Sequence, residues 1–433
     1  MSASLHKELL TTVPDHGITG LAIPNQGRAT PVSRTNPAPG ATGVSVLFIS
    51  HYCGRNGAPL ILLRLLQWIK AHTNINIQVL LRSPGELQAE FEAIGTSFLV
   101  PRLSMIPSAI VRRTCGQSAV NAIEDTLLRR KVRRLNPSLI YSNTITNTRE
   151  LLALAPLKVA TLCHVHEMAW ICGEFGPQAQ LATVPLISRF VAVATAVRDH
   201  LVSGMGVNPE AIELVKEFPW SSPSPPREMA ELRASARREL GVDEETFVVG
   251  ACGTIDWRKG ADLFLAVARA VSQGHQFRFI WIGGPTTGKF FEQLRHDIES
   301  SGLSNSVAFL GPSSTPEKYY AAMDTILLSS REDPCPLVML EAAAYGLPIV
   351  CFDGSGGAPE FVGNDAGIAV PYLDTLEMAR ALTRLRESPE MRERFAAVAK
   401  ERVQERHDPD TQCAALFSAM CRTQPLLTGA ART

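Results

Sequence analysis

The sequence has no apolar run long enough to cross a membrane. No window of about 18 residues is both apolar and free of charge. The best candidate, residues 151–172, is interrupted by Lys158, His164, His166 and Glu167. The sequence therefore predicts a protein without a transmembrane segment.

Net charge of one sign and a regular cysteine pattern are also missing. The 42 lysines and arginines balance the 42 aspartates and glutamates, so no overall basic field would attract nucleic acid. Nine cysteines, an odd number scattered over 433 residues, do not form a disulfide framework. We therefore expect a reducing, cytoplasmic location.

The two ends of the chain lack the patterns of packed structure. The first residues carry Lys7, Glu8 and Asp15 where a signal peptide would need an unbroken apolar stretch. They continue into polar sequence punctuated by proline, so residues 1–43 are predicted to be a disordered N-terminal tail. Roughly ten residues at the C-terminal end are also expected to be unpacked.

Between these ends, short apolar runs alternate with helical patterns, and 45% hydrophobic residues are enough for sizeable cores. The strand candidates are residues 44–50, 74–81, 139–141, 159–162 and 190–193 in the first half, and 247–251, 277–282, 307–310, 325–328 and 349–352 in the second. Strands separated by helices predict parallel sheets with both faces covered, an α/β fold.

A proline-rich stretch separates the two series of strands and predicts a linker. The expected parts are an N-terminal domain (44–219), a linker (220–226), a C-terminal domain (227–405) and a C-terminal helix and tail (406–433). The predicted architecture is two Rossmann-like βαβ domains that face each other across a cleft.

One segment of the second half carries the clearest chemical pattern. Residues 337–345 are rich in helix formers, and Gly346 follows where a helix commonly ends. The helix is therefore predicted to begin after Pro336, where free backbone N–H groups suit an anion such as a diphosphate. Glu341 lies one turn inside and Asp333 precedes the helix, so both carboxylates could accept hydrogen bonds from sugar hydroxyls. The alternative is that Glu341 is an ordinary solvated helix residue.

Residues 333–348 resemble the nucleotide-sugar signature of the family-four retaining glycosyltransferases, two-domain enzymes of the group 1 type with the GT-B fold. Four further segments resemble the same family in the same order: 54–59, 164–167, 253–260 and 356–360. The resemblance extends from about residue 44 to residue 407. It implies that the N-terminal domain takes the acceptor and that the C-terminal domain binds a nucleotide sugar.

The resemblance also implies roles for single residues. The candidate catalytic residues are His166, Asp333, Lys259 and Arg258, and the candidate donor-binding residues are Gly57, Gly253, Gly283, Leu337, Val338 and Glu341. In this assignment Glu341 binds the nucleotide ribose, Asp333 the hydroxyls of the donor sugar and Lys259 the diphosphate. His166 contacts the transferred sugar from the opposite domain, and the Gly57 loop closes over the reaction centre.

Three positions depart from the family pattern. The first acid is usually glutamate and here is Asp333, which is one methylene shorter. Thr254 occupies the position of a phosphate-binding arginine, so Arg258, beside Lys259, is the expected replacement. Pro336 stands where a glycine N–H is common, so one backbone donor is missing. These departures concern the choice of donor more than the reaction class.

The expected activity is metal-independent, retaining transfer of a sugar from a nucleoside diphosphate sugar. The sugar expected is a hexose. The acceptor would be a saccharide or lipid-linked saccharide in cell-surface polysaccharide or glycoconjugate synthesis. Lys259, Arg258 and the helix N-terminus near Leu337 would stabilise charge on the leaving diphosphate, so no metal ion or cofactor is expected. Two alternatives stay open: a catalytically silent sugar-nucleotide-binding subunit, and nucleotide-sugar epimerisation on the same scaffold.

Two other motifs are incomplete, and a third lies in the wrong structural context. Residues 283–289 match a phosphate-binding loop until Phe290 replaces the Ser or Thr that would bind Mg²⁺. Residues 354–357 lack the last glycine of a dinucleotide fingerprint. The D-x-D sequence Asp408-Pro-Asp410 follows a predicted helix and not a strand. NTPase, hydride-transfer and metal-dependent transferase functions are therefore less favoured.

Basic residues gather in the first half of the chain. Residues 43–220 hold 17 Lys and Arg against 12 Asp and Glu, and the excess concentrates in one arginine-rich run. A helix end in water is the simpler interpretation, since cations suit the C-terminal end of a helix. The other interpretation is that Arg129, Arg130, Arg133 and Arg134 contact an anionic membrane surface, which would place the protein peripherally at the inner membrane surface.

Overall fold

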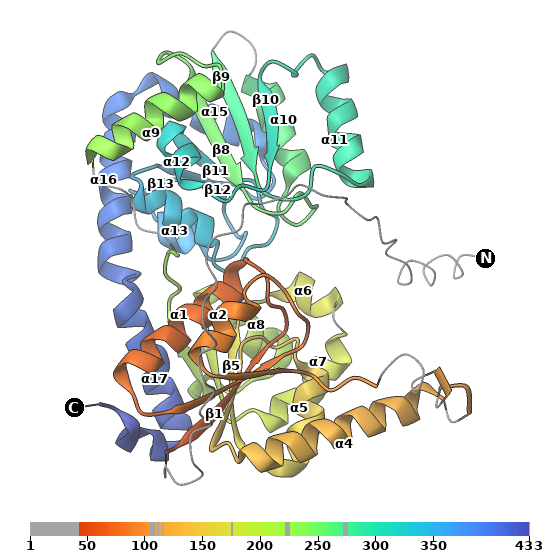
Figure 1. Cartoon of the computed structure of the whole chain (residues 1–433). Helices are drawn as coiled ribbons and strands as arrows, with labels where there is room; N and C mark the ends of the chain where they lie inside the picture. The colour runs from red at the N-terminus through yellow and green to blue at the C-terminus, as the bar shows by residue number, and fades with distance from the viewer. Residues whose placement is uncertain are drawn as a thin grey trace, which may run out of the picture. The chain divides into compact units, whose positions relative to one another are not determined.

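The structure is a computed structural model that describes residues 43–103, 109–110, 112–114, 116–174, 176–220, 226–271 and 276–432. The predicted N-terminal tail, apart from its last residue, lies outside the described residues, and so do residues 221–225 of the predicted linker. The described part contains two parallel β-sheets with helices, which confirms the predicted α/β class (Figure 1). We call strands β1–β7 with their helices the first lobe, and strands β8–β13 with their helices the second lobe.

The first sheet has the strand order β3-β2-β1-β4-β5-β6-β7. Its strands are β1 (Ser45–Ser50), β2 (Asn76–Leu81), β3 (Thr96–Leu99), β4 (Leu139–Ser142), β5 (Ala160–Val165), β6 (Arg189–Ala192) and β7 (Ile212–Leu214). Its helices are α1 (Gly57–His72), α2 (Gln88–Ile94), α4 (Gln117–Leu135), α5 (Thr148–Leu154), α6 (Ala169–Glu174), α7 (Pro177–Thr183) and α8 (Thr195–Met205). Val46 and Phe48 of β1 enter one core while Leu47 and Ile49 enter another, because helices cover both faces of the sheet.

The second sheet has the order β10-β9-β8-β11-β12-β13. Its strands are β8 (Phe247–Cys252), β9 (Phe277–Ile282), β10 (Val307–Gly311), β11 (Thr325–Leu328), β12 (Ile349–Phe352) and β13 (Gly367–Val370). Its helices are α9 (Pro226–Glu239), α10 (Ala261–Val271), α11 (Lys289–Ser300), α12 (Glu317–Ala322), α13 (Leu337–Ala344), α14 (Ala358–Val362), α15 (Thr375–Glu387) and α16 (Pro389–Arg406). Since all strands are parallel, the loops after them gather at one edge of each sheet.

The C-terminal end of the chain returns to the first lobe. Asp408 caps α17 (Pro409–Thr423) by accepting the N–H of Thr411 at 2.8 Å, and α17 lies beside α1 (Figure 1). Leu427 and Ala430, in the 3₁₀ helix Pro425–Ala430, are buried in the core under α1. The expectation that the last ten residues are unpacked is therefore wrong, because their apolar side chains complete that core.

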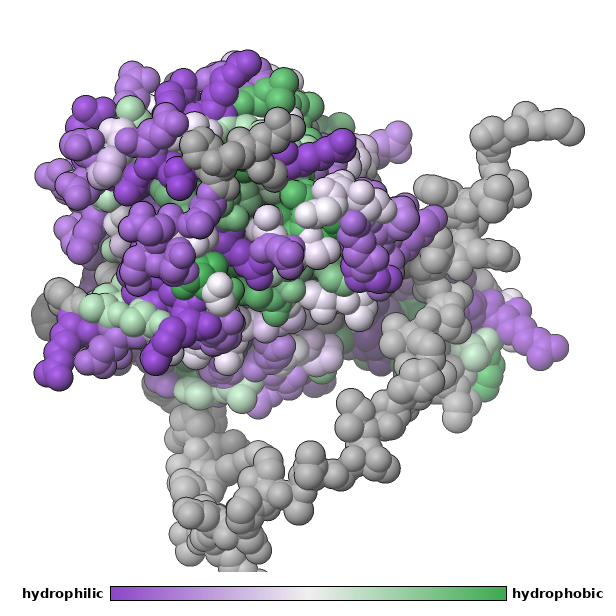
Figure 2. Space-filling model, turned by 90° about the horizontal axis from the view of Figure 1, so that it is seen from above, coloured by the Kyte–Doolittle hydropathy of each residue, from purple (hydrophilic) through white to green (hydrophobic). Residues whose placement is uncertain are grey.

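Among the described residues, no helix is long and apolar enough to cross a membrane. On the visible part of the face shown in Figure 2, apolar side chains form only small patches between hydrophilic ones. A surface of this kind is typical of a face in contact with water.

Candidate functional site

The loop after β8 brings a lysine against an aspartate. Lys259 Nζ lies 2.5 Å from Asp333 Oδ2, and both side chains are largely buried. Ser330 Oγ donates to the same carboxylate oxygen at 3.3 Å. Gly260 has a φ of 72°, and a Cβ there would lie 1.9 Å from the carbonyl oxygen of Ser329, so the loops can approach this closely only with glycine. A cation and an acceptor-only carboxylate thus share one partly buried site.

Arg258 and Thr254 of the same loop take different directions. Arg258 Nη1 donates to the carbonyl oxygen of Glu332 at 2.8 Å, so its guanidinium is directed toward the segment that carries Asp333. Thr254 Oγ1 donates to Asp256 Oδ2 at 2.6 Å, and the other oxygen of that carboxylate accepts the Lys259 N–H at 2.7 Å. Asp256 therefore fixes the loop, and Arg258 contacts the backbone one residue before Asp333.

The first turn of α13 lies where the sequence predicts it. Pro336 is the N-cap, and the Met339 N–H donates to its carbonyl oxygen at 2.9 Å. This leaves the N–H groups of Leu337 and Val338 as the candidate anion donors. A Cβ built on Gly57, at the start of α1, would lie 3.6 Å from the Leu337 side chain. This part of the first lobe therefore lies close to the N-terminus of α13.

Glu341, one turn into α13, is not an ordinary solvated helix residue. Its side chain is half-buried, and its Oε2 accepts a hydrogen bond from the Tyr320 hydroxyl at 2.8 Å. Burial raises the pKa of Glu341 to about 7; the Tyr320 hydroxyl and the Trp220 N–H oppose this rise, and the charge of Glu317 adds to it. A carboxyl with this pKa changes its protonation near neutral pH.

Gly253 and Gly283, two candidate donor-binding residues, lie side by side at the ends of β8 and β9. A Cβ built on Gly283, whose φ is 93°, would come within 2.9 Å of the Gly253 carbonyl oxygen. The Trp281 Nε1–H donates to that same oxygen at 3.1 Å. Gly283 therefore permits a close approach of backbone that a larger residue would prevent, whereas a Cβ on Gly253 would lie 3.5 Å from the Lys259 side chain.

In the first lobe, His166 follows β5 and is held by a residue distant in the sequence. Its Nδ1 lies 2.6 Å from Glu217 Oε1, and the two side chains are only 8% and 5% exposed. Its Nε2 is buried and has no hydrogen-bond partner among the described residues. The ring of His164, whose Nδ1 lies 2.7 Å from the Tyr141 hydroxyl, has its centre 4.1 Å from that of His166. Burial lowers the pKa of His51 to about 4.

Glu167 shapes the loop that carries His166. Its buried carboxylate accepts the Thr144 hydroxyl, the His166 N–H at 3.0 Å and the Ile145 N–H at 3.4 Å. Burial raises the pKa of Glu167 despite these donors. The side chain thus orders the loop after β5.

Two contacts near the candidate site join the lobes. The Trp170 N–H, on α6, donates to both carboxylate oxygens of Glu332 at 3.2 and 3.0 Å. The rings of Trp170 and Trp257 lie 4.4 Å apart although they are 43% and 45% exposed. An exposed aromatic pair therefore bridges the loop after β8 and the helix after β5.

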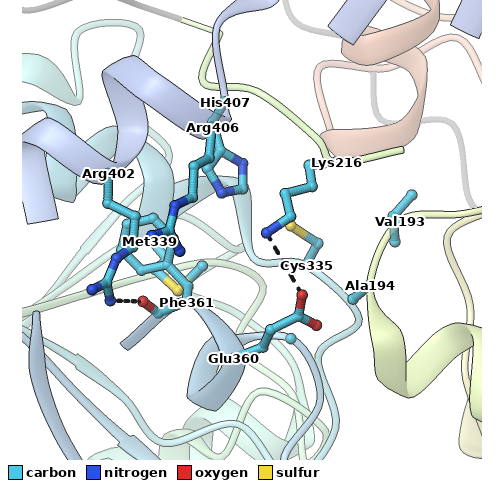
Figure 3. A pocket seen from close by; sticks show the side chains of 11 residues that line it. Val193, Ala194, Lys216, Cys335, Met339, Glu360, Phe361, Arg402, Arg406 and His407 are labelled. Carbon is cyan, nitrogen blue, oxygen red and sulfur yellow. Dashed lines mark hydrogen bonds and ion pairs between the residues drawn. The ribbon is translucent and has the colours of Figure 1, made fainter. Parts of the chain in front are cut away.

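Glu360, in the motif of residues 356–360, makes a second junction between the lobes. Its Oε2 accepts the Thr195 N–H at 3.0 Å, and its Oε1 lies 3.7 Å from Lys216 Nζ. Figure 3 shows Lys216 directed at Glu360, with Cys335 and His407 close by in the same pocket. This motif thus contacts the first lobe directly.

The predicted residues form two groups. Lys259, Arg258 and Asp333 come together in the second lobe, while His166 lies in the first. No sequence pattern points to three supporting residues, which are Glu217, Tyr320 and Trp170. Among the described residues, no group of three or more His, Cys, Asp or Glu could hold a metal ion.

Comparison with known proteins identifies the second lobe. Residues 233–402 match the family described as glycosyl transferases group 1. The second lobe is therefore similar to group 1 glycosyl transferases. The match covers about two fifths of the chain and contains the Lys259–Asp333 pair and Glu341.

Curated glycosyltransferases share part of this sequence. The chain is 28% identical over 195 residues to the lipopolysaccharide core biosynthesis glycosyltransferase LpsD of Rhizobium meliloti, a match that covers 45% of this chain and 53% of that protein. It is 32% identical over 183 residues to a D-inositol 3-phosphate glycosyltransferase of Saccharomonospora viridis, covering 40% of this chain and 42% of that one. The chain thus matches about half the length of these relatives.

Solved structures share the fold over most of the chain. Anabaena HepE in complex with UDP and glucose superposes with a TM-score of 0.72 at 20% identity, covering 87% of this chain and 98% of that one. WaaG, a glycosyltransferase involved in lipopolysaccharide biosynthesis, superposes with a TM-score of 0.64 at 15% identity, covering 86% and 98%. The GT-B fold of two Rossmann-like domains, as the sequence predicts, is therefore confirmed.

Proposed function

We propose that this chain is a retaining glycosyltransferase that moves a sugar from a nucleoside diphosphate sugar to a saccharide or lipid-linked saccharide. The observation that carries the proposal is the Lys259–Asp333 pair, 2.5 Å apart, beside the N-terminus of α13. The complex of HepE with UDP and glucose supports the donor class, and the resemblance to LpsD supports a role in polysaccharide or glycoconjugate synthesis.

In the proposed reaction, the bond between the anomeric carbon and the diphosphate breaks, and negative charge develops on the leaving phosphate. An acceptor hydroxyl forms the new bond to that carbon on the same face, and its proton passes to the leaving phosphate. Lys259 and Arg258 stabilise that charge, together with the N–H groups at the start of α13. Asp333, positioned by Ser330 and Lys259, accepts hydrogen bonds from hydroxyls of the donor sugar. We propose that no metal ion and no cofactor besides the donor takes part.

Glu341 binds the ribose of the donor in this proposal. Its carboxylate lies one turn inside α13 and already accepts the Tyr320 hydroxyl, which holds it in one orientation. The carboxylate also accepts the Trp220 N–H, and its remaining acceptor sites take the ribose hydroxyls. A charge-assisted hydrogen bond is stronger than a neutral one. His166, with its unpartnered Nε2, contacts the transferred sugar from the first lobe.

Slow hydrolysis of the donor without acceptor tests the proposal. The purified chain would be incubated with uridine, guanosine and adenosine diphosphate sugars, and release of the nucleoside diphosphate followed by chromatography. At least one donor should turn over. If calorimetry shows that a donor binds and none is hydrolysed or transferred, the silent binding subunit is the better account.

A specific surface favours an acceptor at a membrane. On α4, Ile123, Leu127, Arg130 and Arg134 are all exposed, and their spacing of four, three and four places them on one stripe of the helix. Apolar side chains beside arginines suit an anionic lipid surface, to which each cation contributes about 1 kcal/mol. We propose that this stripe gives weak, salt-sensitive attachment.

Sedimentation with lipid vesicles tests the attachment. The chain should pellet with anionic vesicles at low salt and not with neutral ones, and high salt should release it. Replacing Arg129, Arg130, Arg133 and Arg134 with Gln should abolish pelleting. Arg129 is half-buried and donates to Thr126, so a variant that keeps Arg129 is the matched control for folding. A wild type that never pellets with anionic vesicles would refute the attachment.

A further inference from the structure

Glu217 lies on the segment that leaves the first lobe after β7, and its side chain is nearly inaccessible to solvent. Its carboxylate makes the 2.6 Å contact with His166 Nδ1. No motif of the sequence contains it. Burying a carboxylate costs free energy unless it is paired and hydrogen-bonded. The partners of Glu217 therefore indicate which groups it positions.

Glu217 is itself held from two sides. Its carbonyl oxygen lies 2.6 Å from Nδ1 of His407, which follows α16 where the chain returns to the first lobe. Its carboxylate also accepts the thiol of Cys335, in the loop before α13. Burial raises the pKa of that thiol, and the charge of Glu217 raises it further. Both passages of the chain between the lobes therefore meet at this residue, next to the pocket of Figure 3.

The contact decides which nitrogen of His166 carries the proton. An ionised carboxylate can only accept hydrogen bonds, so Nδ1 must be the donor. In the neutral imidazole Nε2 is then the unprotonated nitrogen. Nε2 is also the nitrogen that lacks a partner among the described residues. The carboxylate thus leaves one defined nitrogen for a ligand.

We propose that Glu217 is a positioning residue for glycosyl transfer: it orients the His166 ring and fixes the Nδ1–H tautomer, so that Nε2 can accept a hydrogen bond from a hydroxyl of the transferred sugar. The role in transfer rests on the proposed function. The orientation and the tautomer are properties of the protein alone, and they can be measured without any substrate.

Nitrogen NMR of the imidazole rings measures the tautomer. The chain has 10 histidines, and the signals of His166 are assigned as those lost in His166→Gln. In the wild type, His166 should show a protonated Nδ1 and an unprotonated Nε2. Glu217→Gln keeps an oxygen acceptor and should keep this tautomer, whereas Glu217→Leu should give a mixture. An Nε2–H tautomer in the wild type, or an unchanged spectrum in Glu217→Leu, overturns the proposal.

Donor turnover supplies the second readout. Glu217→Leu should lower kcat by about 10- to 100-fold, the size expected when the partner that orients a functional histidine is removed. KM for the donor should change little, and Glu217→Gln should recover much of the rate. Glu213→Gln is the matched control, because Glu213 lies on β7 and pairs with Arg189 and Arg422. It should leave the tautomer and kcat unchanged.

The two readouts separate the possible failures. If the wild type turns over no donor but shows the expected tautomer and its loss in Glu217→Leu, the proposed function fails and the positioning stands. If the wild type is active and Glu217→Leu, folded by circular dichroism, has the wild-type kcat, the positioning role is wrong. Thermal melting of Glu217→Gln and Glu217→Leu shows whether any loss comes from unfolding.

Discussion

The two lobes build their parts of the candidate site in different ways. In the second lobe, Lys259 and Asp333 each lie in a motif that is recognisable by itself, and the fold brings the two motifs together. In the first lobe, His166 lies in a motif, but its orientation depends on Glu217, 51 positions later in a segment without a pattern. The chemistry of the second lobe is therefore visible in local sequence, whereas that of the first appears only after folding.

The largest effect is expected in the second lobe, from Lys259→Ala. The change removes the cation expected to stabilise the leaving diphosphate and leaves Asp333 without its partner. Loss of one such group lowers kcat by about 100- to 1,000-fold. Donor hydrolysis measures it, with Lys289→Ala as the control, because Lys289 is exposed in the incomplete phosphate-binding loop at the start of α11. Equal losses in the two variants would place the phosphate site elsewhere.

Glu341→Gln should weaken donor binding strongly, because a charge-assisted pair of hydrogen bonds becomes neutral. A loss of about 1.5–3 kcal/mol, roughly tenfold or more in affinity, is expected. Calorimetry with nucleoside diphosphate measures it. Tyr320→Phe, which removes only the hydroxyl that orients Glu341, should cost less. Unchanged affinity in Glu341→Gln would remove this residue from the site.

The raised pKa of Glu341 makes donor binding depend on pH. Below its pKa of about 7 the carboxyl carries a proton and offers fewer acceptor sites. Affinity should therefore rise roughly tenfold between about pH 5.5 and pH 8, with proton release on binding. Calorimetry in buffers of different ionisation enthalpy measures that release. The phosphates of the ligand also titrate, so the difference between wild type and Glu341→Gln is the quantity to compare.

The same group affects stability in the opposite direction. Because folding raises its pKa from 4.5, the folded chain holds this proton more tightly than the unfolded chain. Its stabilising contribution is complete below about pH 4.5 and is lost as the pH rises through about 7. Ligand binding and stability thus have opposite dependences on pH at this residue.

The smallest effect is expected where the lobes meet. Trp257→Ala removes the ring contact with Trp170, which is worth about 0.5–1.5 kcal/mol. Small-angle scattering should show compaction of the wild type with saturating nucleoside diphosphate. The variant should need roughly two- to tenfold more ligand for the same compaction. Leu376→Ala, which changes an exposed side chain on α15, is the control. A radius of gyration that ligand never changes would show that closure plays no part.

Most of the fold could be predicted because buried parallel strands are short apolar runs between helices. Three strands, β3, β7 and β13, were missed: they are only three or four residues long, and each has half-buried or exposed positions. The prediction for the C-terminal end is wrong because Leu427 and Ala430 belong to a stretch too short to show a helical or strand period, and the core that they enter includes α1. The spacing of apolar residues within one segment does not show which distant element packs against it.

The candidate site was predictable to the extent that its residues lie in motifs. The contact of Arg258 with the Glu332 carbonyl and that of Gly57 with Leu337 needed the backbone positions, although the residues themselves were expected. Glu217 and Tyr320 had no signal, because each acts through one long-range hydrogen bond. Sequence patterns locate the groups that meet a ligand more readily than those that orient them.

The stereochemistry of donor hydrolysis tests the central claim most directly. A donor that turns over would be incubated with the wild type, and the first sugar released would be observed by proton NMR before its anomers equilibrate. The account predicts that the sugar initially has the anomeric configuration of the donor, and that Lys259→Ala releases almost none. Initial release of the opposite anomer, or binding of donors with no release of sugar, would contradict it.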